Sequence, residues 1–133
     1  MTSGANIFTH PVHLGRGATA VPQPEFTGDM KWYDAYIERH AADGKEGRLV
    51  SMFTFDKSWD SWEMHPQGHE VVLCTAGKIR LHQEHPDGSR RTVTLAAGEY
   101  AINEPGTWHT ADVDEPATAV FITVGLGTQH RPR

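Results

Sequence analysis

The hydrophobic pattern of this chain changes character near residue 48. From there onward apolar and polar residues alternate in short runs, as in residues 49–55 and 78–84, and turn-forming residues separate the runs. Alternation with a period of two indicates strands that bury one face. The run 70–75 is largely apolar, which is typical of a strand covered on both faces. Short strands joined by polar turns predict an all-β sandwich or barrel over residues 48–124.

One helix is predicted before these strands. Asp29 can accept backbone N–H bonds at its N-terminus, and Gly44 is well placed just past its end. A single apolar stripe at helical spacing is formed by Tyr33, Tyr36, Ile37 and Ala41. These signals predict a helix over residues 29–43 that lies across one face of a sheet or against a partner subunit.

The pattern divides a single domain, residues 1–133, into three parts. Residues 1–47 form an N-terminal extension. Its first half is rich in Gly, Pro and Thr, which is typical of loops, and its second half carries the predicted helix. Residues 48–124 form the barrel. Residues 125–133 are expected to be a loosely held tail.

Acidic and imidazole side chains gather around one short break in the strand pattern. Glu63 and His65 lie two residues apart, so in an extended segment both point to the same face. After a Pro-Gln-Gly break comes Glu70, at the start of the next apolar run. Further on, a Pro-Gly turn delivers His109 to the start of another strand. These four side chains are candidates for one shared metal shell.

The spacing around these residues resembles the two sequence motifs of the cupin family. The first motif appears as Glu63-x-His65-x4-Glu70-x6-Gly77, with Glu63 where the family usually has a His. The second motif is matched at Gly98, Gly106 and His109. It departs from the family at two positions, because the Pro is shifted by one place to Pro105 and Val113 replaces the usual Asn. The resemblance implies a double-stranded β-helix, the cupin jelly-roll barrel, and a family-based expectation of a homodimer.

A divalent metal is the cofactor that these donors suit. Two imidazoles and two carboxylates, from Glu63, His65, Glu70 and His109, suit Fe, Mn, Ni or Zn. Two carboxylates carry more negative charge than the usual cupin shell of three His and one Glu, which favours harder ions such as Mn(II) or Fe(II) over Cu. We also expect Cys74 and Trp108 to line the ligand pocket, because Cys74 has the same strand phase as Glu70 and Trp108 flanks His109.

Three functions are compatible with these residues. The first is a metal-dependent enzyme, dioxygenase-like or isomerase-like, that acts on an unidentified small molecule in the barrel. The second is a metal-free ligand-binding cupin, in which Glu63 and Glu70 act as a carboxylate pair with one pKa raised by the other. The third is a non-catalytic dimeric module. No residue is assigned as catalytic, and cupin folds serve enzymes and binding proteins alike.

Composition narrows the partners and the compartment. The formal net charge is −5 with a pI near 5.9, and no basic stripe is present, so neither nucleic acid nor an anionic membrane is expected as a partner. A single cysteine excludes an internal disulfide framework and fits a reducing compartment. No leader pattern and no apolar run of membrane-spanning length is found, so we expect a cytoplasmic protein.

Overall fold

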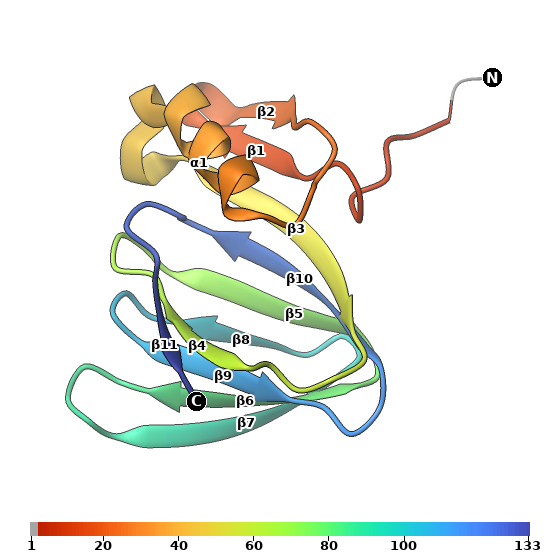
Figure 1. Ribbon diagram of the computed structural model, residues 1–133, viewed down its shortest axis with the longest axis vertical. Helices are drawn as coiled ribbons and strands as arrows, with labels where there is room; N and C mark the ends of the chain where they lie inside the picture. The colour runs from red at the N-terminus through yellow and green to blue at the C-terminus, as the bar shows by residue number, and fades with distance from the viewer. Residues whose placement is uncertain (1–2) are drawn as a thin grey trace.

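The computed structural model describes residues 3–133 and shows two β-sheets with an N-terminal segment above them (Figure 1). The helical elements are α1 (Met30–Arg39) and two 3-10 segments, Arg16–Ala18 and Ala41–Glu46. The strands are β1 (Val12–Gly15), β2 (Thr19–Pro22), β3 (Arg48–Phe55), β4 (Ser61–Met64), β5 (Glu70–Ala76), β6 (Lys78–Glu84), β7 (Arg90–Ala96), β8 (Tyr100–Asn103), β9 (Trp108–Asp112), β10 (Ala117–Thr123) and β11 (Gln129–Pro132).

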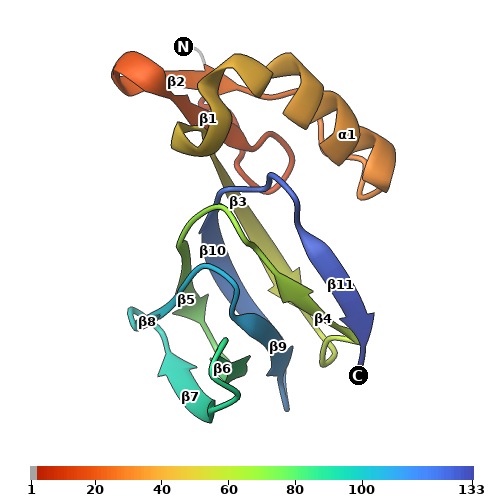
Figure 2. The ribbon, with the colours of Figure 1, turned by 90° about the vertical axis from the view of Figure 1, so that its left-hand side faces the viewer.

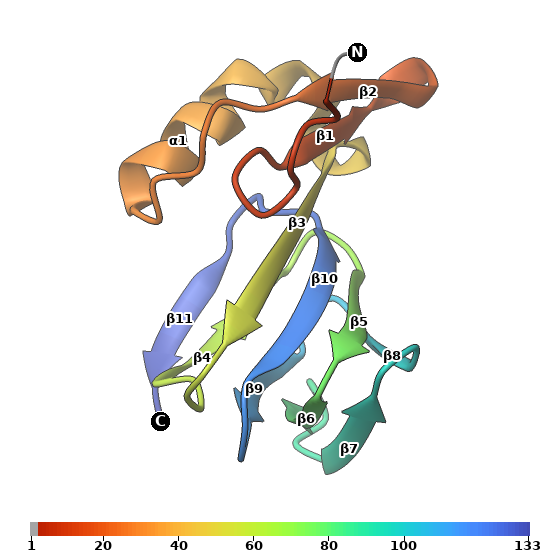
Figure 3. The same cartoon turned by 90° about the vertical axis from the view of Figure 1, so that its right-hand side faces the viewer.

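The two sheets face each other as the layers of a barrel. The six-stranded sheet has the order β2-β1-β3-β10-β5-β8, and the five-stranded sheet has the order β11-β4-β9-β6-β7. Figure 3 shows β10 running between β3 and β5 on one wall. The alternating apolar residues of both sheets point inward and form the core, which includes Val72, Leu81, Leu95, Ala119 and Phe121. The predicted double-stranded β-helix is confirmed.

Helix α1 lies across one end of this barrel, above β3 and β11 (Figure 2). The Asp29 side chain accepts a hydrogen bond from the Trp32 backbone N–H at 3.0 Å and so caps the helix. Trp32 and Tyr36, one turn apart, are buried against Leu49 of β3. The helix is shorter than predicted because His40 leaves helical geometry and stacks on the ring of His13, 3.8 Å between centroids.

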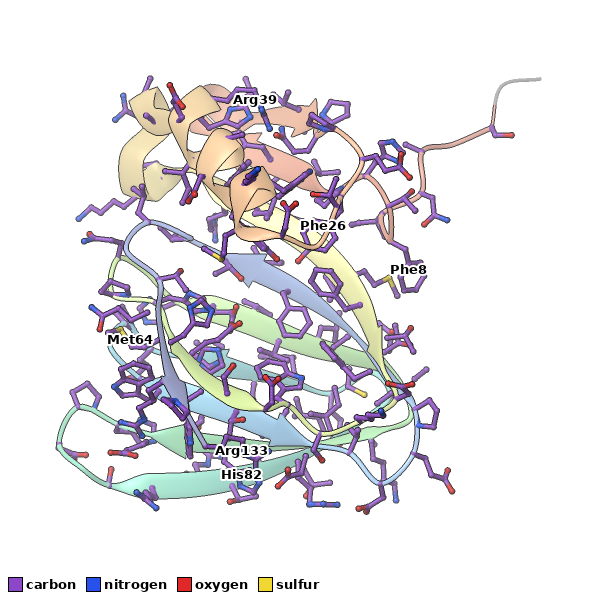
Figure 4. All side chains as sticks on the ribbon, in the orientation of Figure 1. Phe8, Phe26, Arg39, Met64, His82 and Arg133 are labelled. Carbon is purple, nitrogen blue, oxygen red and sulfur yellow. The ribbon has the colours of Figure 1, made fainter. Side chains whose placement is uncertain are left out.

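The C-terminal residues are held more firmly than the sequence predicted. Residues 129–132 form β11, which pairs with β4 along its whole length. Arg131 places its guanidinium over the rings of Trp62 and Trp108, and Arg133 donates to Asp112 at 2.7 Å. Arg133 and His82, which both contact Asp112, lie close together in Figure 4. Arginine contacts rather than an apolar alternation hold this strand, so the hydrophobic pattern gave no sign of it.

Two glycines of the predicted motifs sit where the backbone requires glycine. Gly77 has a φ of 72°, and a Cβ added there would lie 2.6 Å from the Pro116 carbonyl oxygen. Gly106 has a φ of 82° in the turn that precedes β9. Positive φ is costly for other residues, so glycine suits both of these tight turns. Within residues 3–133 no helix has the length and apolar character needed to cross a membrane.

Candidate metal centre

Strand pairing brings the two sequence motifs to one place inside the barrel. Glu63 of β4 and His109 of β9 are direct cross-strand partners. His65 follows β4 by one residue, and Glu70 opens β5 after the Pro-Gln-Gly turn. The backbone N–H of Gly106 donates to the His65 carbonyl at 3.1 Å, which joins the turns of the two motifs.

The structure brings together all four residues that the sequence proposed as a shell. Nε2 of His65 lies 3.2 Å from Oε2 of Glu70, and Nε2 of His109 lies 3.1 Å from Oε1 of the same carboxylate. Oε2 of Glu63 lies 3.8 Å from both imidazole Nε2 atoms. Glu63, His65 and His109 each offer a donor atom within 4.8 Å of the others. His65, Glu70 and His109 are buried, whereas Glu63 is partly exposed toward the cavity.

The partners of the two imidazoles fix which ring nitrogen faces the site. Thr128 Oγ1 donates to the Gly125 carbonyl at 2.9 Å, so it accepts from Nδ1 of His65 at 2.8 Å. Nδ1 of His109 faces the Thr107 carbonyl, which can only accept, at 3.3 Å. In the neutral rings Nε2 is therefore a free lone pair, and both Nε2 atoms are buried without a hydrogen-bond partner among the described residues.

Glu70 is oriented by a polar chain that the sequence did not reveal. Asn103 Nδ2 donates to Oε1 of Glu70 at 3.0 Å, and Thr123 Oγ1 donates to Oε2 at 2.6 Å. Nε2 of Gln83 in turn donates a hydrogen bond to Oδ1 of Asn103 at 2.8 Å. Burial acts to raise the pKa of Glu70, but His109 and His65 outweigh it and hold that pKa well below its usual range. Glu70 is therefore an anion fixed in place between two imidazoles.

The donor atoms of this arrangement fit a cation. Two imidazole lone pairs face carboxylate oxygens at distances that are unfavourable unless a proton or a metal ion lies between them. Without metal, a proton can fill this role at His109: burial acts to lower the pKa of His109, but its contact with Glu70 and the charges of Glu70 and Glu63 together outweigh burial, so this pKa is raised. A divalent ion would satisfy both imidazoles and both carboxylates at once, and this donor set suits Fe, Mn, Ni or Zn. The residues present therefore fit a metal.

Three of the four residues, Glu63, His65 and Glu70, line a cavity of about 820 Å³, and His109 is fully buried beside them. Its lining is rich in aromatic side chains, which include Phe53, Phe55, Trp59 and Phe121, and α1 contributes Tyr33 and Tyr36. The Trp59 ring stands edge-on to the His109 ring, 6.2 Å between centroids. Burial, and then the charges of Glu63 and Glu70, raise the pKa of Tyr33 to about 12, so this phenol is a neutral hydrogen-bond donor near the site.

Two predicted pocket residues lie elsewhere. Cys74 is fully buried in the hydrophobic core, and its Sγ faces the carbonyls of Ala76 and Gly77 rather than the cavity. Trp108 precedes His109 on β9, so strand alternation turns its ring to the opposite face, where it packs under Arg131. The tryptophan that lines the cavity is Trp59.

Sequence reasoning also missed His130. Its Nε2 lies 3.4 Å from Oε1 of Glu63, because β11 pairs His130 directly with Glu63. No local sequence signal marks His130, because it reaches Glu63 only through the pairing of β11 with β4. His69, by contrast, is exposed in the turn between β4 and β5 and takes no part in the site.

A second group of histidines and an acid lies under α1. Donor atoms of His13, His40 and Asp43 also come within 4.8 Å of one another. In this group Nε2 of His13 contacts Asp43 at 2.7 Å, and its Nδ1 contacts the Tyr36 hydroxyl at 2.6 Å. Both nitrogens of His13 already have partners, so the group is a hydrogen-bonded support for the helix.

Comparison with known proteins places the fold. Neither a family profile nor a curated protein sequence matches this chain. A hydroquinone 1,2-dioxygenase from Sphingomonas sp. with 4-hydroxybenzoate bound is similar in structure, with a TM-score of 0.51 and 17% identity over 59% of this chain and 60% of that one. An oxalate oxidase is similar with a TM-score of 0.56 and 14% identity over 69% of this chain and 50% of that one.

A third similar structure is a conserved protein with a double-stranded β-helix domain from Klebsiella pneumoniae. Its TM-score is 0.51, with 22% identity over 64% of this chain and 73% of that one. These likenesses show that the chain has the double-stranded β-helix fold, as the cupin resemblance implied. It spans only 60% of the dioxygenase and half of the oxidase, so these matches concern the barrel.

Proposed function

We propose that this protein is a metal-dependent enzyme that acts on a small, largely apolar and planar molecule, with dioxygenase-like chemistry. The observation that carries the proposal is the pair of buried Nε2 lone pairs, on His65 and His109, that face two carboxylates beside an aromatic cavity. Isomerase-like chemistry is the second form that the same donors support.

Each residue of the site has a defined part in this proposal. His65 and His109 would hold the ion through Nε2, and Glu70 would bind it as a carboxylate kept in place by Asn103 and Thr123. Glu63 would complete the shell from the cavity side. The ion would supply Lewis acidity, and redox chemistry if it is iron, at a position open to the cavity.

The cavity wall favours a planar apolar ligand. Phe53, Phe55 and Trp59 present aromatic surface that binds such a molecule and excludes water from the reacting end. The neutral phenol of Tyr33 can donate a hydrogen bond to a ligand oxygen, since its pKa of about 12 keeps it protonated at neutral pH. The fold likeness to a hydroquinone dioxygenase with 4-hydroxybenzoate bound is consistent with this class of ligand.

Metal analysis and ligand titration test the proposal together. Purified protein is expected to retain about one divalent ion per chain, and a His109→Ala variant is expected to lose it. In metal-loaded protein, hydroquinone and 4-hydroxybenzoate are suitable probes, because a ligand bound only to the native state must raise the melting temperature. Oxygen consumption with hydroquinone then reports dioxygenase chemistry. Retention of metal by the His109→Ala variant would contradict the assigned site.

A metal-free binding protein is the alternative that one observation favours. A protonated His109 can pair with Glu70 at 3.1 Å and so satisfy the site without any ion. In that case wild-type protein would carry no metal, and aromatic probes would still raise its melting temperature. A homodimeric state and a cytoplasmic location remain predictions, which light scattering and cell fractionation would test.

A further inference from the structure

The last strand of the chain reaches into the candidate metal centre. In β11 the register places His130 opposite Glu63, and its Nε2 lies 3.4 Å from Oε1 of that carboxylate. Both side chains line the large cavity. The contact joins the first predicted motif to a residue 67 positions later, at the end of the chain.

The two oxygens of Glu63 face different neighbours. Oε2 lies 3.8 Å from Nε2 of His65 and of His109, on the side where a metal would bind. Oε1 lies toward His130. A carboxylate with one oxygen engaged in a hydrogen bond tends to bind a metal ion as a monodentate ligand through the other oxygen, because the hydrogen-bonded oxygen is less available to the ion.

The position of His130 is set by its neighbours in β11. Arg131 lies over the rings of Trp62 and Trp108 and pairs with Glu84, and Arg133 pairs with Asp112. These contacts hold β11 against its neighbouring strands, so the strand as a whole keeps His130 beside Glu63. Loss of its imidazole alone should leave the strand in place, since its side chain is 46% exposed.

We infer that His130 is a positioning residue of the metal centre. Its Nε2 donates to Oε1 of Glu63, so that Glu63 would hold an ion through Oε2 alone. The inference rests on the metal site proposed above. It assigns a function to β11, a strand that lies outside the two sequence motifs.

Metal titrations of His130 variants test this inference with metal alone. Apo protein is titrated with Mn(II), followed by electron paramagnetic resonance, and with Co(II), followed by its visible absorption. His130→Ala is expected to weaken binding about 10–100-fold, the usual cost of removing a partner of a metal ligand. The Co(II) bands of this variant should also weaken, because Glu63 can then bind through both oxygens and raise the coordination number.

Two further variants separate positioning from a structural effect. His130→Gln places an amide donor near the same point and should restore most of the affinity and the Co(II) spectrum. Gln129→Ala changes an exposed neighbour in the same strand and should match the wild type. The melting temperatures of all four metal-free proteins should agree closely.

The outcomes distinguish the two proposals. If the wild type binds Mn(II) and Co(II) and His130→Ala binds them equally well with the same spectrum, the inference about His130 is overturned and the metal site stands. If the wild type binds neither ion, the proposed metal-dependent function is overturned, and the positioning role falls with it. A weakened His130→Ala that His130→Gln fails to restore would also overturn the hydrogen-bonding role.

Discussion

Among residues 3–133, two clusters bring histidines and carboxylates within metal-binding distance of one another, and they differ in whether buried ring nitrogens have partners. Under α1, both ring nitrogens of His13 have partners, in Tyr36 and Asp43. In the barrel, the Nδ1 atoms of His65 and His109 are satisfied, whereas their buried Nε2 atoms are not. Donor spacing is similar in the two clusters, at 4.8 Å or less. Unsatisfied lone pairs, rather than proximity, therefore distinguish a candidate metal centre from a structural network.

The difference follows from what each cluster must do in the folded chain. The Asp43–His13–Tyr36 chain ties the segment after α1 to β1, so its hydrogen bonds are complete without any ligand. The barrel cluster has a buried anion, Glu70, whose charge requires a cation nearby. Stability should therefore depend on the first cluster, and ion binding on the second.

The largest expected effect is on metal affinity. Replacing His109 by Ala removes a ligand and should weaken Mn(II) binding by more than about 100-fold, since loss of an outer partner alone costs up to that factor. Replacing His13 by Ala should leave the affinity unchanged. Isothermal titration of the two apo variants makes the comparison. Equal loss in both would show that metal binding does not distinguish the clusters.

The next effect is on stability. His13→Ala should lower the free energy of unfolding of the apo protein by about 2–4 kcal/mol, because it leaves the buried Tyr36 hydroxyl unpaired and opens a cavity. Urea denaturation measures the change. His69→Ala, in the exposed turn beside the metal centre, is the matched control and should be close to neutral. A neutral His13→Ala would remove the structural role given to this cluster.

A smaller effect concerns the pH dependence of metal binding. Burial acts to lower the pKa of His109, but the contact with Glu70 and the charges of Glu70 and Glu63 together outweigh it, so this pKa is raised above its ordinary 6.5. Protons therefore compete for Nε2 more strongly as the pH falls, and affinity should decline by about tenfold per pH unit where one proton is displaced. Titrations at several pH values follow this slope. A pH-independent affinity around neutrality would argue against imidazole ligation.

The smallest effect is on acid stability. The hydrogen bond from His13 lowers the pKa of Asp43 below its ordinary 3.8. A depressed folded-state pKa adds stability that is present above the unfolded pKa and is lost as the pH falls through the folded pKa. The advantage of the wild type over Asp43→Asn should thus shrink as the pH drops below about 4. Urea denaturation across this range measures it, and a constant difference would contradict the pairing.

The sequence predicted the barrel and four site residues because both depend on local pattern. Alternation specified the strands, and motif spacing placed Glu63, His65, Glu70 and His109 near one another. Trp108 was expected in the pocket because it flanks His109, but strand alternation turns its side chain to the opposite face.

The remaining site residues depend on contacts between distant segments. Asn103 and Thr123 reach Glu70 only through the pairing of β5 with β8 and β10. His130 reaches Glu63 only because arginine contacts hold β11 against β4. Neither pairing has a sequence signal that can be recognised without the fold. Cys74 is a case in which a local pattern was insufficient. It has the same strand phase as Glu70 and was therefore expected to line the pocket, yet it lies in the hydrophobic core toward the other end of β5.

Anomalous diffraction at the manganese edge, from crystals grown with Mn(II), locates any bound ion. We expect one strong peak bonded to Nε2 of His65 and of His109 and to carboxylate oxygens of Glu63 and Glu70, with none at His13, His40 and Asp43. A peak at the second cluster, or no peak in the barrel at saturating Mn(II), would contradict it.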